Sequence, residues 1–322
     1  MTMQFEEFAQ GAATDGVLTA EEILSLRGEA WRVGGIDPDE AEALFLANER
    51  LESPNPEWTA FFVEALSEFI VNTVEPHGYV DQEMADELLG RIDNDGRVDT
   101  VAEIELLVRV LEKALNVPAN LKAYALQQIE LAVVHGEGPT RTGDAAGHSI
   151  SAAEADLLRR LIFAAGGDRP ASVSKAEAEL LFRIKDATLY EPNDPEWSTL
   201  FVQGVANFLL GFGGHEPLSR ERSGELETFM ASEGAGIGGF LGRMLTSKPD
   251  VAGFGSLLSE APAENDWAED AERAAVLEEA EADWLRDKLD ADEELDDLEK
   301  ALIAFIDAET GEAFVPRPSL ST

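Results

Sequence analysis

Carboxylate side chains that could hold a metal ion gather in two stretches of this chain. The first group is Asp93, Asp95 and Asp99, and the second is Asp290, Asp292, Asp296 and Glu299. Their spacing resembles that of a calcium-binding loop, in which six to eight oxygens surround the ion. The match is incomplete because Arg91 and Lys288 stand at the first ligand position and Ala102 ends the first loop. We therefore predict, at most, a weak site for Ca²⁺ or another divalent cation in these turns, and no other cofactor.

A capping pattern recurs around these carboxylates and shows which elements position them. An apolar residue is followed by Ser, Thr or Asp and, three residues later, by Glu; the five instances are Thr19/Glu22, Asp37/Glu40, Ser151/Glu154, Ser174/Glu177 and Asp296/Glu299. This is a capping box, in which two side chains satisfy backbone N–H groups of the first helical turn. Three further copies, beginning at Asp81, Asp99 and Ser219, lack the Glu. The stretches "NPEW" and "DPEW" add caps at Asn55 and Asp194, each followed by proline at the first helical position.

Apolar residues after each cap are spaced by three and four positions, as in "PEWTAFFVEALSEFI", and strand-like alternation is absent. The pattern predicts an all-α fold with four or five helices in each half of the chain, joined by short capped turns. We expect Trp58, Trp197 and the phenylalanines to form the core.

The two halves of the chain resemble each other. "DEAEALFLANERLESPNPEWTAFFVEALSEFI" (39–70) aligns with "AEAELLFRIKDATLYEPNDPEWSTLFVQGVANFLL" (176–210), pairing Phe45 with Phe182 and Trp58 with Trp197. Three further blocks follow in the same order, and the last pairs Asp93 with Asp290 without a gap. Four ordered blocks predict two tandem helical-bundle repeats.

The alignment also predicts the limits of the parts. They are a tail over 1–14, repeat A over 15–134, a linker over 135–146, repeat B over 147–310 and a tail over 311–322. Repeat B differs by an inserted helical segment at 223–281. Glycine and proline in "HGEGPTRTG" mark the linker.

The charge of the chain restricts its partners. With 65 Asp and Glu against 24 Lys and Arg, the formal net charge is −41. Such a surface repels nucleic acid and anionic lipid and attracts metal cations or basic proteins, so we expect no direct nucleic-acid binding. No cysteine is present, which excludes disulfides and thiolate chemistry. Without a signal peptide or an apolar run long enough to span a membrane, the chain is expected to be cytoplasmic.

The Asp-Gly, apolar residue and Glu at a helix start, repeated in an acidic all-helical chain, resemble the TerB-like tellurite-resistance family in two tandem copies. The resemblance implies divalent-metal binding near these turns and a role in stress response. By position it nominates Asp15, Glu22, Asp95 and Glu154 as ligands. Asp-Gly is present only at 15–16 and 95–96, and His148 replaces the glycine in the second half.

The insertion is the feature that most distinguishes the second half. Its first part places Ile237, Phe240, Leu241, Met244 and Leu245 on one helical stripe. Its second part contains Trp267 and leads into an acidic stretch: residues 260–299 hold eighteen Asp and Glu against three Lys and Arg. We expect these six apolar residues to bind a basic or amphipathic protein partner, or to mediate self-association through 232–260.

No catalytic arrangement or phosphate-binding loop is present, and His77 and His215 precede equivalent caps with no assigned role. We therefore predict a non-enzymatic, acidic interaction or scaffold protein. The alternatives are a metal-binding stress-response protein of TerB type and a nucleic-acid mimic that occupies a DNA-binding protein.

Overall fold

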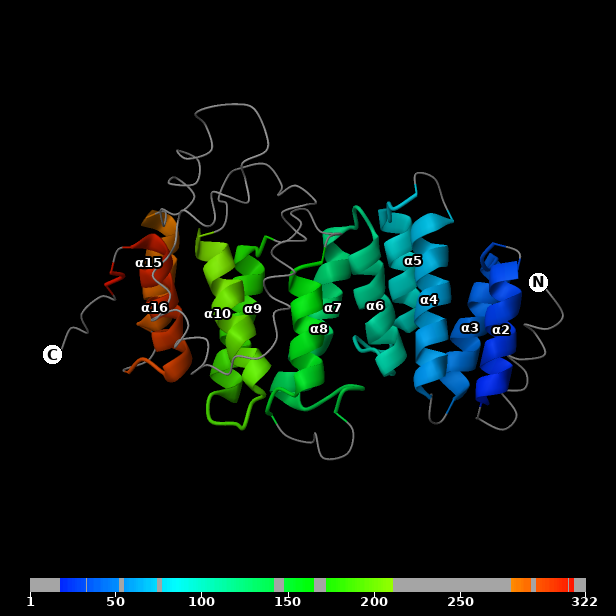
Figure 1. Cartoon of the computed structure of the whole chain (residues 1–322), viewed down its shortest axis with the longest axis horizontal. Coiled ribbons are helices and arrows are strands. Elements are labelled where there is room, and N and C mark those ends of the chain that lie inside the picture. The colour runs from blue at the N-terminus through cyan, green and yellow to red at the C-terminus, as the bar shows by residue number, and fades with distance from the viewer. Residues whose placement is uncertain are drawn as a thin grey trace, which may run out of the picture. The chain divides into compact units, whose positions relative to one another are not determined.

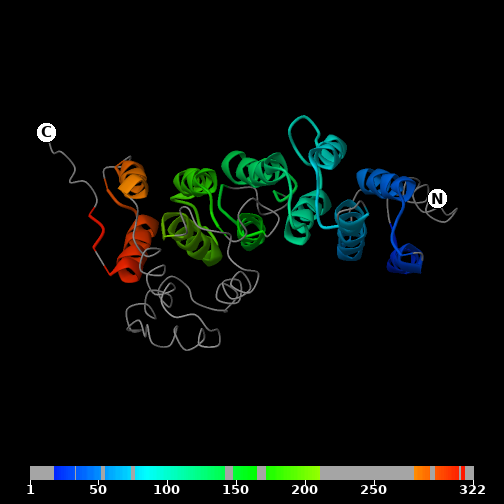
Figure 2. The same ribbon diagram turned by 90° about the horizontal axis from the view of Figure 1, so that it is seen from above.

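The computed structural model describes residues 18–32, 34–51, 55–73, 77–141, 148–164, 172–210, 279–290, 294–311 and 313–315. Within these ranges every regular element is a helix, apart from two isolated β-bridges, Tyr79 with Asn116 and Asn94 with Arg97 (Figures 1 and 2). The predicted all-α class is confirmed. The tandem duplication stays a prediction.

The helices follow one another through short connections. In chain order they are α2 (Ala20–Arg32), α3 (Pro38–Arg50), α4 (Pro56–Asn72), α5 (Gln82–Ile92), α6 (Val101–Lys113), α7 (Ala119–His135), α8 (Ala152–Ile162), α9 (Lys175–Thr188), α10 (Pro195–Leu210), α15 (Glu279–Leu289) and α16 (Asp297–Thr310). None of the helices in these ranges has the length and apolar content needed to cross a membrane.

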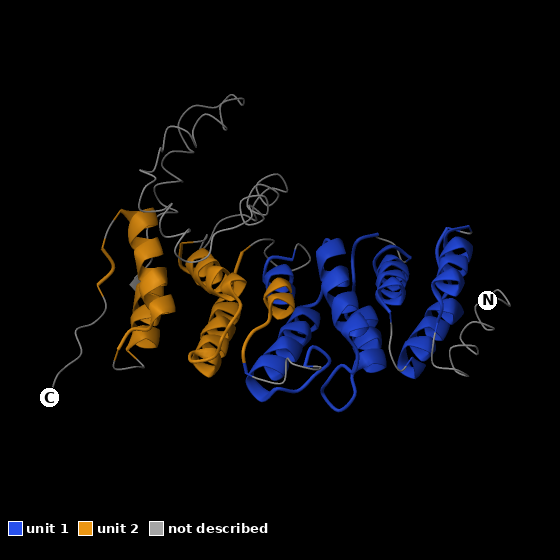
Figure 3. Cartoon of the chain, turned by 60° about the horizontal axis from the view of Figure 1, so that its bottom comes forward, with its two compact units in different colours: residues 1–148, 157–170 blue, residues 149–156, 171–322 orange. Residues whose placement is uncertain are grey.

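The chain forms two compact units (Figure 3). Unit 1 comprises Met1–His148 and Leu157–Pro170, and unit 2 comprises Ser149–Asp156 and Ala171–Thr322. The division falls inside α8, whose first turns belong to unit 2 and whose later turns belong to unit 1. The two units are defined by contacts in space, whereas the repeats are defined by sequence similarity. The repeat and linker boundaries therefore stay predictions.

Unit 1 is built around α4, which packs against α2, α3 and α6. The rings of Trp58, Phe61 and Phe62 on α4 are completely buried, and Phe45 of α3 meets Phe62 edge to face at 5.6 Å between centroids. A buried aromatic side chain contributes about 3–5 kcal/mol relative to alanine, so these rings hold the unit together.

Unit 2 is organised in the same way around α10, which packs against α9 and α16. Trp197 and Phe201 of α10 are completely buried, and Phe182 of α9 lies 5.2 Å from Phe201. Trp284 of α15 closes the cluster against Phe182 and Phe208, at 5.6 and 4.9 Å. The prediction that Trp58 and Trp197 are core residues is confirmed.

The helix starts confirm the capping pattern almost throughout. All five predicted boxes form, as do the caps at Asn55, Asp81 and Asp194, while Ser219 lies outside the described residues.

One capping assignment is wrong. The cap of α6 is Thr100, not Asp99, and its box is complete, because Glu103 accepts from the Thr100 N–H. The gap-free alignment pairs Asp99 with Asp296, the cap of α16. Because α6 is capped by Thr100, the stretch from Asp93 to the cap of α6 is one residue longer than the stretch from Asp290 to the cap of α16.

Candidate functional site

The turn over 93–99 is a tight hairpin. Asn94 and Arg97 exchange both backbone hydrogen bonds, and Asp95 and Gly96 between them have φ of +53° and +87°. Positive φ at both central residues defines a type I′ turn, for which Asp-Gly is a favoured pair. The Asp-Gly that suggests a calcium loop is thus required by the backbone conformation of the hairpin.

Asp93 and Asp99 of this turn already have hydrogen-bond partners. Asp93 accepts from the Tyr124 hydroxyl at 2.6 Å, and Asp99 accepts from the Asn94 amide at 2.9 Å. Burial and the neighbouring Asp93 raise the pKa of Tyr124. Gln128 fixes the hairpin by accepting from Val98 N–H and donating to the Gly96 carbonyl. Within the described ranges no three His, Asp or Glu side chains are placed to hold a metal ion, and the metal hypothesis for Asp93, Asp95 and Asp99 stays a prediction.

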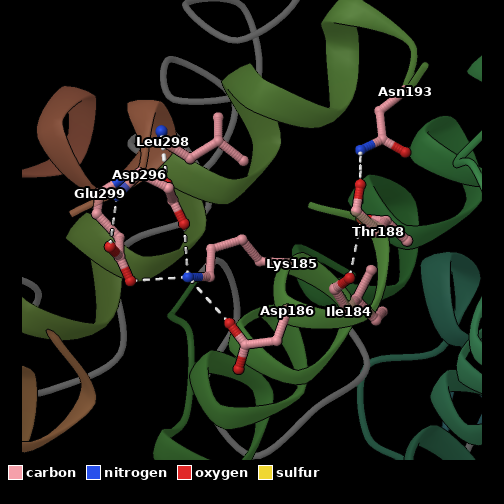
Figure 4. A network of polar contacts seen from close by, with 8 residues as sticks. All are labelled: Ile184, Lys185, Asp186, Thr188, Asn193, Asp296, Leu298 and Glu299. Atoms are coloured by element: carbon pink, nitrogen blue, oxygen red, sulfur yellow. Dashed lines mark hydrogen bonds and ion pairs between the residues drawn. The ribbon is translucent and has the colours of Figure 1, made fainter. Parts of the chain in front are cut away.

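The second predicted metal turn is organised around a lysine (Figure 4). The ammonium of Lys185, on α9, lies 2.8 Å from Asp296 Oδ2 and 2.7 Å from Glu299 Oε1, and 2.9 Å from Asp186 Oδ1. A protein cation thus occupies the space between two of the predicted ligands. A metal ion would have to displace it. Asp290 ends the described part after α15, and Asp292 lies outside the described residues.

The centre of the Lys185 cluster is buried. Lys185 and Glu299 are each 1% exposed. Asp296 and Glu299, which contact Lys185, also form the capping box of α16. Burial by itself lowers the pKa of Lys185, but the hydrogen bonds to Asp296, Glu299 and Asp186 outweigh it and raise the pKa above the ordinary lysine value. Phe182 adds a cation–π contact, its ring centroid 5.6 Å from the ammonium.

Unit 1 has a counterpart of this cluster with a neutral side chain in place of the lysine. Extending the alignment of Phe45 with Phe182 pairs Asn48 of α3 with Lys185. The Asn48 amide donates to Thr100 Oγ1 at 3.0 Å and to Glu103 Oε1 at 3.3 Å, and Asn48 Oδ1 accepts from Trp58 Nε1 at 3.1 Å. Thr100 and Glu103 are the capping box of α6, as Asp296 and Glu299 are that of α16.

Sequence analysis did not identify Asn48 and Lys185, the residues at the centres of the two clusters, although the position of Lys185 along its helix was informative. Lys185 lies on the same helical stripe as Leu181, Phe182 and Thr188, which face the core. A lysine in that register indicates a buried ion pair.

Of the remaining nominated ligands, Glu22 and Glu154 belong to capping boxes of other helices. Glu22 accepts from Thr19 in the capping box of α2, and these hydrogen bonds lower its pKa. Glu154 is completely buried and accepts from Ser151. Asp15 lies outside the described residues, as do the predicted partner-binding residues Ile237, Phe240, Leu241, Met244, Leu245 and Trp267.

Unit 1 has a groove on its surface that could receive another molecule. It runs along α4 and α6, has a volume of about 930 Å³ and is open to solvent. Ala60, Val63 and Val101 contribute apolar surface, and Asp99 and Arg109 contribute charge.

Comparisons of the chain with protein-family models, with curated proteins and with solved structures give no match. The resemblance to TerB-like proteins therefore stays a prediction.

Proposed function

We propose that the chain is a non-enzymatic, acidic interaction protein that binds a basic protein partner. The observation that carries the proposal is the location of the carboxylates. In the described ranges only five acidic side chains are buried, Glu40, Glu103, Glu154, Glu177 and Glu299, and each is the glutamate of a capping box. The other carboxylates there are in contact with solvent.

Within the described ranges, the surplus negative charge thus lies on helix surfaces instead of being neutralised inside. A surface of this kind attracts basic proteins over a distance of about one Debye length and accelerates their association. The six apolar residues of the insertion are proposed to add a short-range contact with the partner.

The proposal is tested by capturing proteins from the host lysate on the immobilised chain. We expect the captured proteins to be predominantly basic and to be released between about 0.05 M and about 0.5 M salt, because screening weakens contacts between exposed charges. Polyglutamate of matched charge, immobilised at the same density, is the control for unspecific ion exchange. If both surfaces retain the same proteins, the proposed function is wrong.

Deleting residues 232–260 tests whether the insertion contributes to partner binding. We expect the deletion variant to retain fewer proteins at intermediate salt than the full chain. Equal retention would remove the insertion from the proposal and leave the acidic surface.

A further inference from the structure

The groove of unit 1 has the dimensions of a helix-binding site. Its walls are the first three turns of α4 and the whole of α6, and the segment of α4 from Pro56 to Ser67 is about 16 Å long at 1.5 Å per residue. A bound rod of that length would be a helix of about three turns.

The floor of the groove leaves apolar atoms accessible in the unbound protein. Val101, the first residue of α6, is 44% exposed, although most large apolar side chains of the described ranges are buried. Ala60 and Val63 lie on the facing surface of α4. Small and β-branched residues on two adjacent helices make a shallow apolar surface that fits the apolar face of a third helix.

The charges along the groove are distributed unevenly. Arg109 and Lys113 line one end and are neutralised by Glu112 and Glu68. At the other end, Asp99 is exposed, and the partner that faces its carboxylate is the neutral amide of Asn94. The two other lining carboxylates, Glu64 and Glu105, are paired with Arg27 and Arg160. The Asp99 end is therefore negative, and the groove combines an apolar floor with one anionic end.

We infer that this groove binds an amphipathic helix of a basic protein partner, with the basic side chains of that helix next to Asp99. The inference rests on the proposed function and names its docking site. The orientation follows from the helix dipole, because the positive N-terminus of the bound helix is favoured next to the Asp99 carboxylate. A second copy of this chain fits the site less well, because it would bring another charge of −41 to the same surface.

The test uses the full chain and a fluorescent three-turn helical peptide with leucine and alanine on one face and lysine on the others. A second peptide, with glutamate in place of lysine, is its matched control. We expect fluorescence anisotropy to detect binding of the lysine peptide alone, and NMR amide shifts to cluster in α4 and α6.

Two substitutions address the floor and the anionic end separately. Ala60→Gln fills the floor without changing the charge and is expected to weaken lysine-peptide binding about tenfold or more. Asp99→Asn removes one exposed carboxylate and is expected to weaken it about two- to fivefold. Glu87→Gln removes an equally exposed carboxylate from α5, outside the groove, and should leave binding unchanged. Circular dichroism of each variant verifies that the helices are retained.

Other outcomes overturn the inference in different ways. If Ala60→Gln binds the lysine peptide as well as the wild type does, the groove is not the site, although the proposed function stands. If the wild type sediments as a dimer and Ala60→Gln as a monomer, the occupant is a second copy. If a peptide of residues 232–260 binds more tightly than the lysine peptide, the occupant is a segment of this chain. If the lysine peptide does not bind the wild type, this docking inference is wrong, and only the lysate experiment decides the proposed function.

Discussion

The Asn48 cluster of unit 1 and the Lys185 cluster of unit 2 each provide a polar partner for a buried glutamate, but with different side chains. Each receives the buried glutamate of a capping box, Glu103 in α6 and Glu299 in α16. In unit 2 an ammonium neutralises the carboxylate and its neighbour Asp296. In unit 1 the cap is the neutral Thr100, so only one buried charge remains, and an amide suffices as its partner.

The aligned tryptophans Trp58 and Trp197 also differ in their hydrogen bonding. Asn48 has an oxygen that accepts from Trp58 Nε1, whereas an ammonium has no acceptor to offer. Trp197 Nε1 is buried without a hydrogen-bond partner within the described ranges. The two clusters thus differ in charge, through both the central residue and the cap residue, and the two tryptophans differ in hydrogen bonding.

The largest expected effect is that of removing Lys185. Lys185→Ala leaves Asp296 and Glu299 in a buried site without their cation, and breaking a buried ion pair in this way costs about 3–5 kcal/mol. We expect the free energy of unfolding of unit 2 to fall by about that amount, measured by urea denaturation with hydrogen exchange in α9 and α16 as the local probe.

Lys300→Ala is the matched control, because Lys300 forms an exposed pair with Asp297 and its loss should cost at most about 1 kcal/mol. Equal losses in the two variants would mean that burial of the Lys185 cluster does not matter energetically.

Removing Asn48 should have a smaller effect. Asn48→Ala leaves Trp58 Nε1 without an acceptor and Glu103 without its amide donor, and an unsatisfied buried group costs about 1–3 kcal/mol. Hydrogen exchange in α3 and α6 should report this loss, and α9 and α16 should be unaffected. A loss in unit 1 as large as that of Lys185→Ala in unit 2 would contradict the distinction between the neutral and the charged cluster.

Calcium should discriminate between the two clusters once the lysine is removed. In Lys185→Ala, the carboxylates of Asp296 and Glu299 lose the ammonium that neutralised them, so that a divalent cation near them would relieve their mutual repulsion. We expect millimolar Ca²⁺ to raise the melting temperature of this variant more than that of the wild type or of Asn48→Ala. The same shift in all three proteins would show that calcium acts by screening alone.

The smallest expected effects are those of pH. Burial raises the pKa of Glu103 above its ordinary value of 4.5. As the pH falls through that raised pKa, the folded state takes up a proton before the unfolded chain does, so this residue makes unit 1 more stable toward pH 4.5. The raised pKa of Lys185 acts at the other end of the range: its stabilisation of unit 2 is complete below pH 10.5 and is lost as the pH rises further.

Asn48→Lys tests the cause of the Glu103 shift. An ammonium at that position favours the ionised carboxylate, so we expect the pKa of Glu103 to fall, as followed by NMR of its carboxyl carbon. An unchanged pKa would mean that burial alone, and not the neutral partner, sets the titration of Glu103.

The sequence by itself determined the helices of this protein. Caps such as Asp37, Ser174 and Asp296 act within their own first turn, and the apolar spacing after them depends on the helical repeat alone, so local pattern was sufficient. The local pattern gave the wrong cap for α6, because Asp99 and Thr100 are both good capping residues. The hairpin over 94–97, which Gln128 of α7 holds in place, determines that Thr100 is the cap.

The environment of the carboxylates was decided only by the tertiary structure. Asp296 and Glu299 stand 111 and 114 residues from the lysine that neutralises them, and no local spacing reveals that contact. The groove along α4 and α6 likewise exists only after the two helices have packed. Helix starts depend on neighbours along the chain, whereas the charge state and accessibility of a side chain depend on neighbours in space.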